Sequence, residues 1–203
     1  RLREPLITDW RELASSLAHA IGPDLDPPYV FYGHSFGGLV AFELARQLIW
    51  EGYPPPAALV VGACLPPTRW PRRARPLHKM NDQDLAAEVL AAGETPAAVL
   101  QNAELRNLLL PIIRADFKLC ETYARSSGPP LDVPAVVLAG QDDAEAPAAN
   151  MPEWKRESTV ETRFHVVPGS HLFLRSHRAE LLGLLRTELA RLLGAKGLSP
   201  ATA

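Results

Sequence analysis

One serine in this sequence has the local setting that nucleophilic attack on a carbonyl requires. Ser35 is the centre of the pattern Gly33-His34-Ser35-Phe36-Gly37, which lies between an apolar run and an apolar helix. A G-x-S-x-G pattern in this context is typical of a nucleophile elbow, a tight strand-to-helix turn that exposes the serine hydroxyl above the sheet edge. We therefore predict that Ser35 is the nucleophile of an acyl-transfer reaction.

The same turn predicts a group that stabilises the oxyanion formed on attack. The helix after Ser35 begins at Phe36, so its first-turn N–H groups and the positive end of its dipole face the reacting centre. We expect the N–H of Phe36 to be one oxyanion donor. Gly33 and Gly37 are expected to be small because neighbouring backbone occupies the space beside them.

A serine nucleophile needs a base and an acid that orients the base. In sheets with this elbow the chain order is serine, acid, histidine, each on a loop at the carboxyl end of a strand. The loop after the third predicted strand contains Asp142, Asp143 and Glu145. We predict Asp143 as the acid, with Asp142 and then Glu145 as alternatives, because an acidic run after a strand is otherwise a solvated turn.

The predicted base is His171, in the loop Pro168-Gly169-Ser170-His171 after the last predicted strand. A loop histidine is most often a surface residue, but this one completes the expected order after Ser35 and Asp143. His34 points away from the nucleophile at the neighbouring position, so we interpret it as a packing residue or a pocket wall. No metal site is expected, because no histidine pair has ligand spacing and the two cysteines are isolated. The remaining histidines are His19, His78, His165 and His177.

The elements that must position these residues alternate as in an α/β protein. Strands are predicted where apolar runs are bounded by turn residues, and helices where apolar residues recur at helical spacing. This alternation indicates a mostly parallel sheet. The predicted strands are 29–32, 57–63, 133–140 and 162–167, and the predicted helices of this part are 8–21, 36–51, 151–157 and 176–193.

One long segment interrupts the alternation. Between about residues 66 and 125 the helical patterns 81–92, 96–100 and 104–123 follow one another without a strand. We therefore predict a single domain over 1–203, with a core of 1–65 and 126–203 and a helical insertion that acts as a lid. A basic run at the start of the insertion is expected to be a solvated surface, with an anion-facing patch as the alternative. It contains Arg69, Arg72, Arg73, Arg75, His78 and Lys79.

Length and composition exclude several classes of protein. A chain of 203 residues is long enough for one domain with a substantial core. The net charge of −2 gives no electrostatic reason to expect nucleic-acid binding. No apolar run approaches the roughly 18 residues that a membrane span needs. Cys64 and Cys120 form no C-x-x-C pair, which favours a reducing, cytoplasmic setting.

Several stretches together resemble the type II thioesterases that accompany polyketide and nonribosomal peptide synthases. They cover nearly the whole chain in the order of that family. One departure is Ser170, where the family usually has a second glycine before the histidine. The similar stretches are Gly33–Gly38, Phe42–Arg46, Leu110-Pro111, Arg114–Phe117, Glu121–Tyr123, Gly140–Asp143 and Pro168–Phe173.

The resemblance implies an α/β-hydrolase fold and an enzyme that removes stalled or misprimed acyl groups from the phosphopantetheine arm of acyl or peptidyl carrier proteins. In that family the second acid of the Asp-Asp pair serves the triad, and this position is Asp143 here. Ser35 would carry an acyl-enzyme that water then releases, with His171 as base and then acid. The phosphopantetheine belongs to the substrate, so no cofactor is expected, and the protein is expected to be a monomer.

The largest departure from the family pattern is at the front. The family begins with several strands and a His-Ala-Gly-Gly-type loop that supplies the other oxyanion donor, and the present sequence begins at Arg1 after that region. An apolar central strand with an open edge is an aggregation hazard. We therefore expect about 50–70 further N-terminal residues in the native protein, by typical element lengths. Without them, losing an oxyanion donor would cost about 10²–10³ in rate.

Two other functions remain open at this level. A triad determines acyl transfer but not the acyl group, so an esterase, lipase or acyltransferase of the same fold is one alternative. A noncatalytic truncated protein that binds a carrier is the other. Comparing carrier-bound thioesters with oxyesters distinguishes the first, and labelling of Ser35 by a fluorophosphonate distinguishes the second.

Overall fold

The structure, a computed structural model, describes residues 4–71, 74–93 and 95–194. The chain forms two compact units. The helical unit consists of Arg1–Leu13 and Trp70–Ala124, and the sheet unit consists of Ala14–Arg69 and Arg125–Ala203. The predicted arrangement, a single domain with a helical insertion, stays a prediction.

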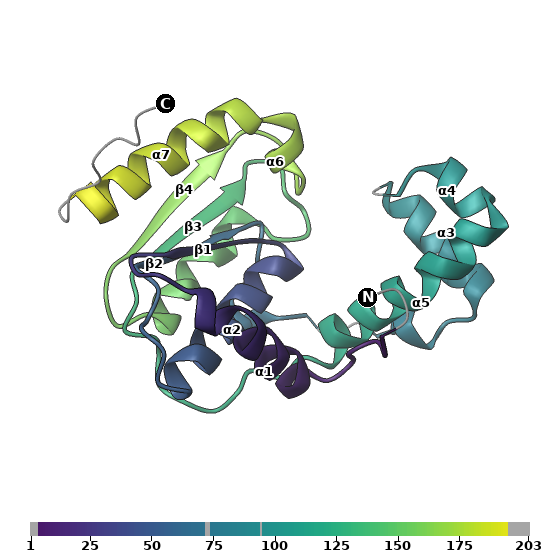
Figure 1. The fold of residues 1–203 in the computed structure, drawn as a ribbon. Helices are drawn as coiled ribbons and strands as arrows, with labels where there is room; N and C mark the ends of the chain where they lie inside the picture. Colours follow the sequence, from purple (N-terminus) through teal and green to yellow (C-terminus); the bar gives the residue numbers. More distant parts are fainter. Residues whose placement is uncertain (1–3, 72–73, 94, 195–203) are drawn as a thin grey trace, which may run out of the picture. The chain divides into compact units, whose positions relative to one another are not determined.

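The sheet unit is built on four parallel strands in the order β1-β2-β3-β4, which Figure 1 shows side by side. Each predicted strand is present within a few residues of its expected bounds. The central strands β2 and β3 are buried along their whole length, as expected for apolar strands covered on both faces. This confirms the α/β class with a parallel sheet. The strands are β1 (Val30–His34), β2 (Ala58–Gly62), β3 (Ala135–Gly140) and β4 (Thr162–Val167).

Two helices cover opposite faces of this sheet, because alternate residues of a strand point to opposite sides. Val60 of β2 belongs to a buried cluster with Leu181 of α7 (Arg178–Gly194). Phe31 of β1 points to the other side and packs on the cluster of Leu44 and Leu48 from α2 (Phe36–Trp50). Helix α1 (Trp10–Ile21) adds Ala18 to that second cluster; its residues from Ala14 onward belong to the sheet unit.

The helical unit has its own small core. Helices α3 (Asp82–Ala92), α4 (Ala97–Gln101) and α5 (Ala103–Thr122) agree with the predicted helices, and none of the described residues of this unit is in a strand. The side chains of Asn81 and Asn102 cap α3 and α5 by accepting backbone N–H groups of the first turn. The core residues are Leu77, Leu85, Val89, Leu100 and Leu110.

A buried carboxylate of α5 holds the short segment before α3. Glu121 accepts hydrogen bonds from the backbone N–H of Leu77 at 2.7 Å and of His78 at 3.1 Å, and its carboxylate is 2.5 Å from His78 Nδ1. Leu77 and His78 belong to the short helix η3 (Leu77–Lys79). Burial alone raises the pKa of Glu121, but these donors more than offset it, and the pKa is lowered overall.

Two helices differ from their predicted form. The segment predicted as a helix over 151–157 is a 3-10 helix, η4 (Ala148–Glu157), with Pro152 inside it. Proline has no N–H and clashes with the preceding turn of an α-helix, which favours the tighter local form here. The last predicted helix is preceded by a separate turn, α6 (Phe173–Ser176). No helix in the described ranges is long and apolar enough to cross a membrane.

Candidate active site

Ser35 occupies the turn between β1 and α2 in a strained backbone conformation, with φ 53° and ψ −125°. Its N–H donates to the carbonyl of Gly62 at 2.7 Å, and its own carbonyl accepts from the N–H of Gly38 at 2.9 Å. These two bonds tie the turn to the neighbouring strand and to the first turn of α2. The G-x-S-x-G pattern therefore adopts the predicted strand–turn–helix geometry.

The glycines of the turn differ in what surrounds them. A Cβ on Gly33 would lie 2.6 Å from the Gly38 Cα and closer still to the Gly37 carbonyl, so only glycine fits there. The expectation was wrong for Gly37, where a Cβ would meet nothing within 4 Å. Gly38 is the second constrained position instead, because a Cβ there would lie 2.8 Å from the Cβ of Cys64.

The structure brings Ser35, His171 and Asp143 together. Ser35 Oγ is 2.7 Å from His171 Nε2, and His171 Nδ1 is 2.9 Å from Asp143 Oδ2. The three residues follow the carboxyl ends of β1, β4 and β3, as the chain order predicted. With Nδ1–H donating to the carboxylate, Nε2 is left as the acceptor of the serine proton. This is the geometry that general-base activation of a serine requires.

Asp143 contacts the histidine, whereas its two alternatives do not occupy this position. The Asp143 side chain is fully buried, while Asp142 and Glu145 are exposed. Besides His171, Asp143 Oδ1 accepts the backbone N–H groups of Glu145 and Ala146, both at 2.9 Å. A buried carboxylate needs such partners, because burial without them would be costly.

The loops of the acid and the base are joined directly. The N–H of Gln141 donates to the carbonyl of Val167, and the N–H of Asp142 donates to the carbonyl of Gly169 at 3.0 Å. A Cβ on Gly140 would lie 2.7 Å from the Ser170 carbonyl oxygen, so the two loops approach closely where β3 ends. Asp142 therefore contributes its backbone to the site and not its carboxylate.

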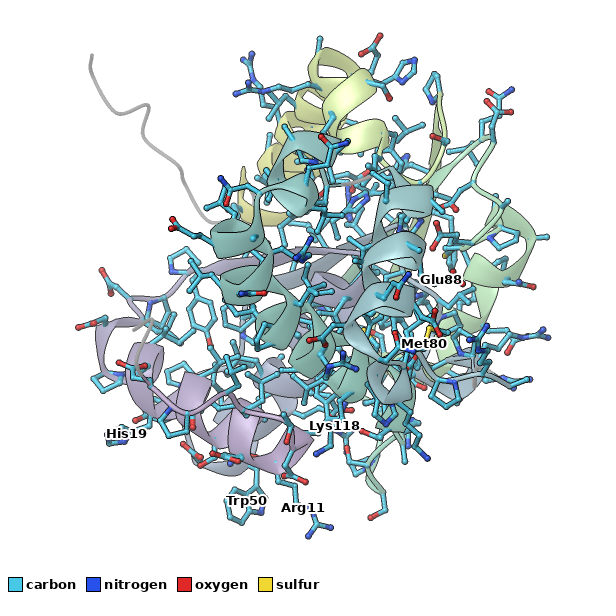
Figure 2. All side chains as sticks on the ribbon, turned by 90° about the vertical axis from the view of Figure 1, so that its right-hand side faces the viewer. Arg11, His19, Trp50, Met80, Glu88 and Lys118 are labelled. Carbon is cyan, nitrogen blue, oxygen red and sulfur yellow. The ribbon has the colours of Figure 1, made fainter. Side chains whose placement is uncertain are left out.

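Sequence reasoning missed a contact of His34. The residue was interpreted as packing, and its ring does pack on Phe173, with 4.9 Å between the ring centroids. Its Nε2 is also 2.7 Å from the backbone oxygen of His171. No sequence signal links two residues so far apart in the chain. Another histidine of the sequence, His19, is exposed and has no such place in the site (Figure 2).

The oxyanion assignment stays a prediction. Phe36 is the first residue of α2, directly after Ser35. The start of a helix directs backbone N–H groups and the positive end of the helix dipole outward, which makes this position suitable for an oxyanion donor. Among the described residues no cluster of His, Cys, Asp and Glu has the arrangement of a metal site.

Three described residues of the basic run contact carboxylates: Arg69, Arg75 and His78. Arg69 Nε donates to Glu153 at 2.5 Å within the sheet unit. In the helical unit Arg75 is 3.4 Å from Asp84, and His78 pairs with Glu121. Arg72 and Arg73 lie outside the described residues. The carboxylate partners of Arg69 and Arg75 thus favour a structural, solvated surface over an anion-facing patch for these two residues.

Known proteins are similar to this chain in both sequence and fold. The family model described as "Thioesterase domain" matches residues 1–189. Linear gramicidin dehydrogenase LgrE of Brevibacillus parabrevis is 32% identical over 203 residues, which cover 98% of this chain and 76% of that protein.

Solved structures extend the comparison. The structure of ClbQ from the colibactin NRPS/PKS pathway matches with a TM-score of 0.84 and 29% identity, over 95% of this chain and 81% of that one. The type II thioesterase BorB from the borrelidin biosynthetic cluster matches with a TM-score of 0.79 and 31% identity, over 90% and 74% of the two chains.

Proposed function

The chain belongs to the thioesterase domain family and is a thioester hydrolase of the α/β-hydrolase fold, and from this premise we propose that it acts on carrier proteins. The substrates would be stalled or misprimed acyl groups on the phosphopantetheine arm of acyl or peptidyl carrier proteins. The observation that carries the proposal is the hydrogen-bonded series from Asp143 through His171 to Ser35. The pathways named for ClbQ and BorB support the class of substrate.

In the first half of the reaction Ser35 Oγ attacks the thioester carbonyl carbon while its proton passes to His171 Nε2. Asp143, bonded at Nδ1, stabilises the imidazolium that forms and keeps the ring in the required tautomer. The N–H of Phe36 donates to the oxyanion. The tetrahedral intermediate then collapses, the C–S bond breaks, and His171 gives its proton to the departing sulfur of the arm.

In the second half water replaces the thiol. His171 Nε2 takes a proton from water as the water oxygen attacks the acyl carbon of the Ser35 ester. The intermediate collapses with Ser35 Oγ as leaving group, and His171 returns the proton to it. The products are the carboxylic acid and the unmodified enzyme, so the chemistry needs no cofactor and no metal. The phosphopantetheine arrives with the substrate.

The name of LgrE, a dehydrogenase, raises the alternative of a redox enzyme that binds a dinucleotide. The sequence of the elbow does not favour this alternative. A dinucleotide site of the G-x-G-x-x-G type needs a glycine at its second position so that backbone can approach the pyrophosphate. In the corresponding pattern, Gly33-His34-Ser35-Phe36-Gly37-Gly38, that position is Ser35, whose hydroxyl contacts His171. The observed contact favours acyl transfer.

The decisive experiment is hydrolysis of an acetyl-loaded carrier protein, with Ser35→Ala as the control. We expect acetate release from the unsubstituted chain and a loss of at least about 10³-fold in the variant. A fluorophosphonate should label Ser35 in the unsubstituted chain only. Faster turnover of simple oxyesters than of carrier-bound thioesters would favour an esterase, and absence of both turnover and labelling would favour a noncatalytic carrier-binding protein.

We propose that the protein is a monomeric, cytoplasmic enzyme whose partner is the carrier protein. Substitutions in the basic run test whether the carrier binds there. Charge reversal at Arg72 and Arg73 should slow hydrolysis of the carrier-bound substrate but spare a small thioester in free solution. Arg186→Glu, at an exposed position outside the run, is the matched control and should leave both rates unchanged. Equal loss on both substrates would contradict a carrier-binding role for the run.

A further inference from the structure

His34 joins the nucleophile strand to the loop of the base. It is the last residue of β1 and directly precedes Ser35, yet its Nε2 lies 2.7 Å from the backbone oxygen of His171. A carbonyl oxygen can only accept a hydrogen bond, so Nε2 carries the proton and donates it. The acceptor belongs to the same residue whose ring contacts Ser35.

The second ring nitrogen of His34 is consistent with this assignment. Nδ1 is 3.3 Å from the hydroxyl of Tyr32, so it can accept the tyrosine proton when Nε2 is the protonated nitrogen. Burial, and secondarily the nearby His171, lower the pKa of His34, although the bond to His171 and the charge of Asp143 act in the opposite direction. The neutral ring of His34 thus donates a hydrogen bond through Nε2 and accepts one through Nδ1.

The half-buried ring of His34 packs against close neighbours. Its edge-on contact with Phe173, a fully buried residue, holds one side, with 69° between the two ring planes. Gly62 leaves room beside Nδ1, because a Cβ there would lie 3.0 Å from His34 Nδ1 and 3.3 Å from both the Tyr32 hydroxyl and the Phe173 Cζ. Gly62 is also the register partner of His34 in the sheet.

We propose that His34 is a positioning residue that holds the backbone of His171 while Asp143 holds its ring. His171 is then held at its backbone by a residue at the end of β1 and at its ring by a residue of the loop after β3. The consequence for rate rests on the proposed function, because the position of His171 matters only if it is the base. A displacement of about 1 Å in a reacting group can cost about 10²-fold in rate.

Kinetics with a small thioester in free solution test this role. His34→Gln keeps an amide N–H at about the reach of Nε2, whereas His34→Asn ends near the position of Nδ1 and cannot reach the carbonyl. We expect Asn to lower kcat by about 10–100-fold with KM changed less than about twofold, and Gln to stay within about threefold of the unsubstituted chain. Tyr32→Phe, which keeps the Nε2 donor, should stay within about twofold.

Two outcomes would overturn the proposal. If His34→Asn keeps the unsubstituted rate, the bond to His171 has no effect on the base. If Gln and Asn lose the same activity, the packing of the ring and not its donor is what matters. A purely structural role would lower the melting temperature of both variants together, without the expected recovery of kcat by Gln.

A measurement on the unsubstituted protein does not depend on activity or on the folding of a variant. Nitrogen-15 NMR of the histidine side chains should show His34 protonated at Nε2 and unprotonated at Nδ1. The opposite tautomer would overturn the proposal. Failure of the proposed function looks different: the unsubstituted chain would hydrolyse no thioester and Ser35 would remain unlabelled, whatever the tautomer of His34.

Discussion

Each unit of this molecule contains a buried carboxylate next to a histidine, but the two pairs have different surroundings. In the sheet unit Asp143 contacts His171, whose other ring nitrogen meets the hydroxyl of Ser35. In the helical unit Glu121 contacts His78 and also accepts the backbone N–H groups of Leu77 and His78. The first pair contacts a nucleophile. In the second pair the carboxylate also binds backbone N–H groups, so that pair is structural.

A third pair in the sheet unit makes the same point. Buried Glu188 of α7 is 2.8 Å from His165 Nε2, and Arg163 and Arg191 donate to the same carboxylate at 3.0 and 3.1 Å. A carboxylate bonded to several cations is a structural cluster. The comparison shows that a carboxylate–histidine contact alone does not indicate catalysis. The indication comes from the group that contacts the second ring nitrogen of the histidine, which is the Ser35 hydroxyl at His171.

The largest expected effect separates the catalytic pair from its neighbour. Asp143→Asn should lower kcat for a small thioester by about 10³–10⁴-fold, because the amide favours the wrong tautomer of His171. Steady-state kinetics measure this directly. Asp142→Asn is the control and should stay within about twofold, because the Asp142 side chain is exposed. Equal losses in the two variants would contradict the assignment of the acid.

Substitution of two glycines of the elbow, Gly33 and Gly37, should have different effects on the free energy of unfolding. Gly33→Ala should lower the free energy of unfolding by about 3 kcal/mol or more, because the new Cβ meets backbone that cannot move aside. Gly37→Ala should be neutral or stabilising by up to about 1 kcal/mol, because its Cβ meets open space in a helix. Denaturant unfolding measures both, and similar losses in the two would show that the turn is packed differently.

The pair in the helical unit should affect stability and not chemistry. Glu121→Ala leaves the N–H groups of Leu77 and His78 without their acceptor, at an expected cost of about 1–3 kcal/mol in local stability. Hydrogen exchange of α5 amides measures it. Glu88→Ala, at an exposed position of α3 labelled in Figure 2, is the matched control and should change stability by less than about 0.5 kcal/mol.

Kinetics complete that test. The kcat of the Glu121→Ala variant for a small thioester should remain within about twofold of the unsubstituted chain, because Glu121 accepts from Leu77 and contacts His78 of its own unit. A loss of kcat comparable to that of Asp143→Asn would mean that the helical unit takes part in the chemistry.

The smallest effect concerns pH. Burial alone raises the pKa of Glu188, but the bonds and charges of Arg191, Arg163 and His165 outweigh it and lower the pKa overall. A lowered folded-state pKa contributes stability above the unfolded-state pKa, and this contribution is lost as pH falls from about 5 through the folded-state value. Melting temperatures between about pH 6 and 3 should fall less steeply for Glu188→Gln than for the unsubstituted chain. A parallel slope would contradict the lowered pKa.

Much of the fold and the place of the site follow from sequence patterns, because the features that decide them are local. Apolar runs between turn residues located the four strands, and the elbow pattern located Ser35. Parallel strands present their carboxyl ends at one edge, so the loops after β3 and β4 had to supply Asp143 and His171. Helix capping by Asn81 and Asn102 is likewise a local property of the chain.

The tertiary structure alone decided the contacts between distant segments. The buried acid of the loop is the one whose carboxylate meets His171 and two backbone N–H groups. Whether a glycine is required depends on its neighbours, as Gly37 and Gly38 show. The bond from His34 to the His171 backbone joins residues 137 positions apart. Such contacts arise from how two loops approach in space, and no periodicity or motif of a single sequence records that distance.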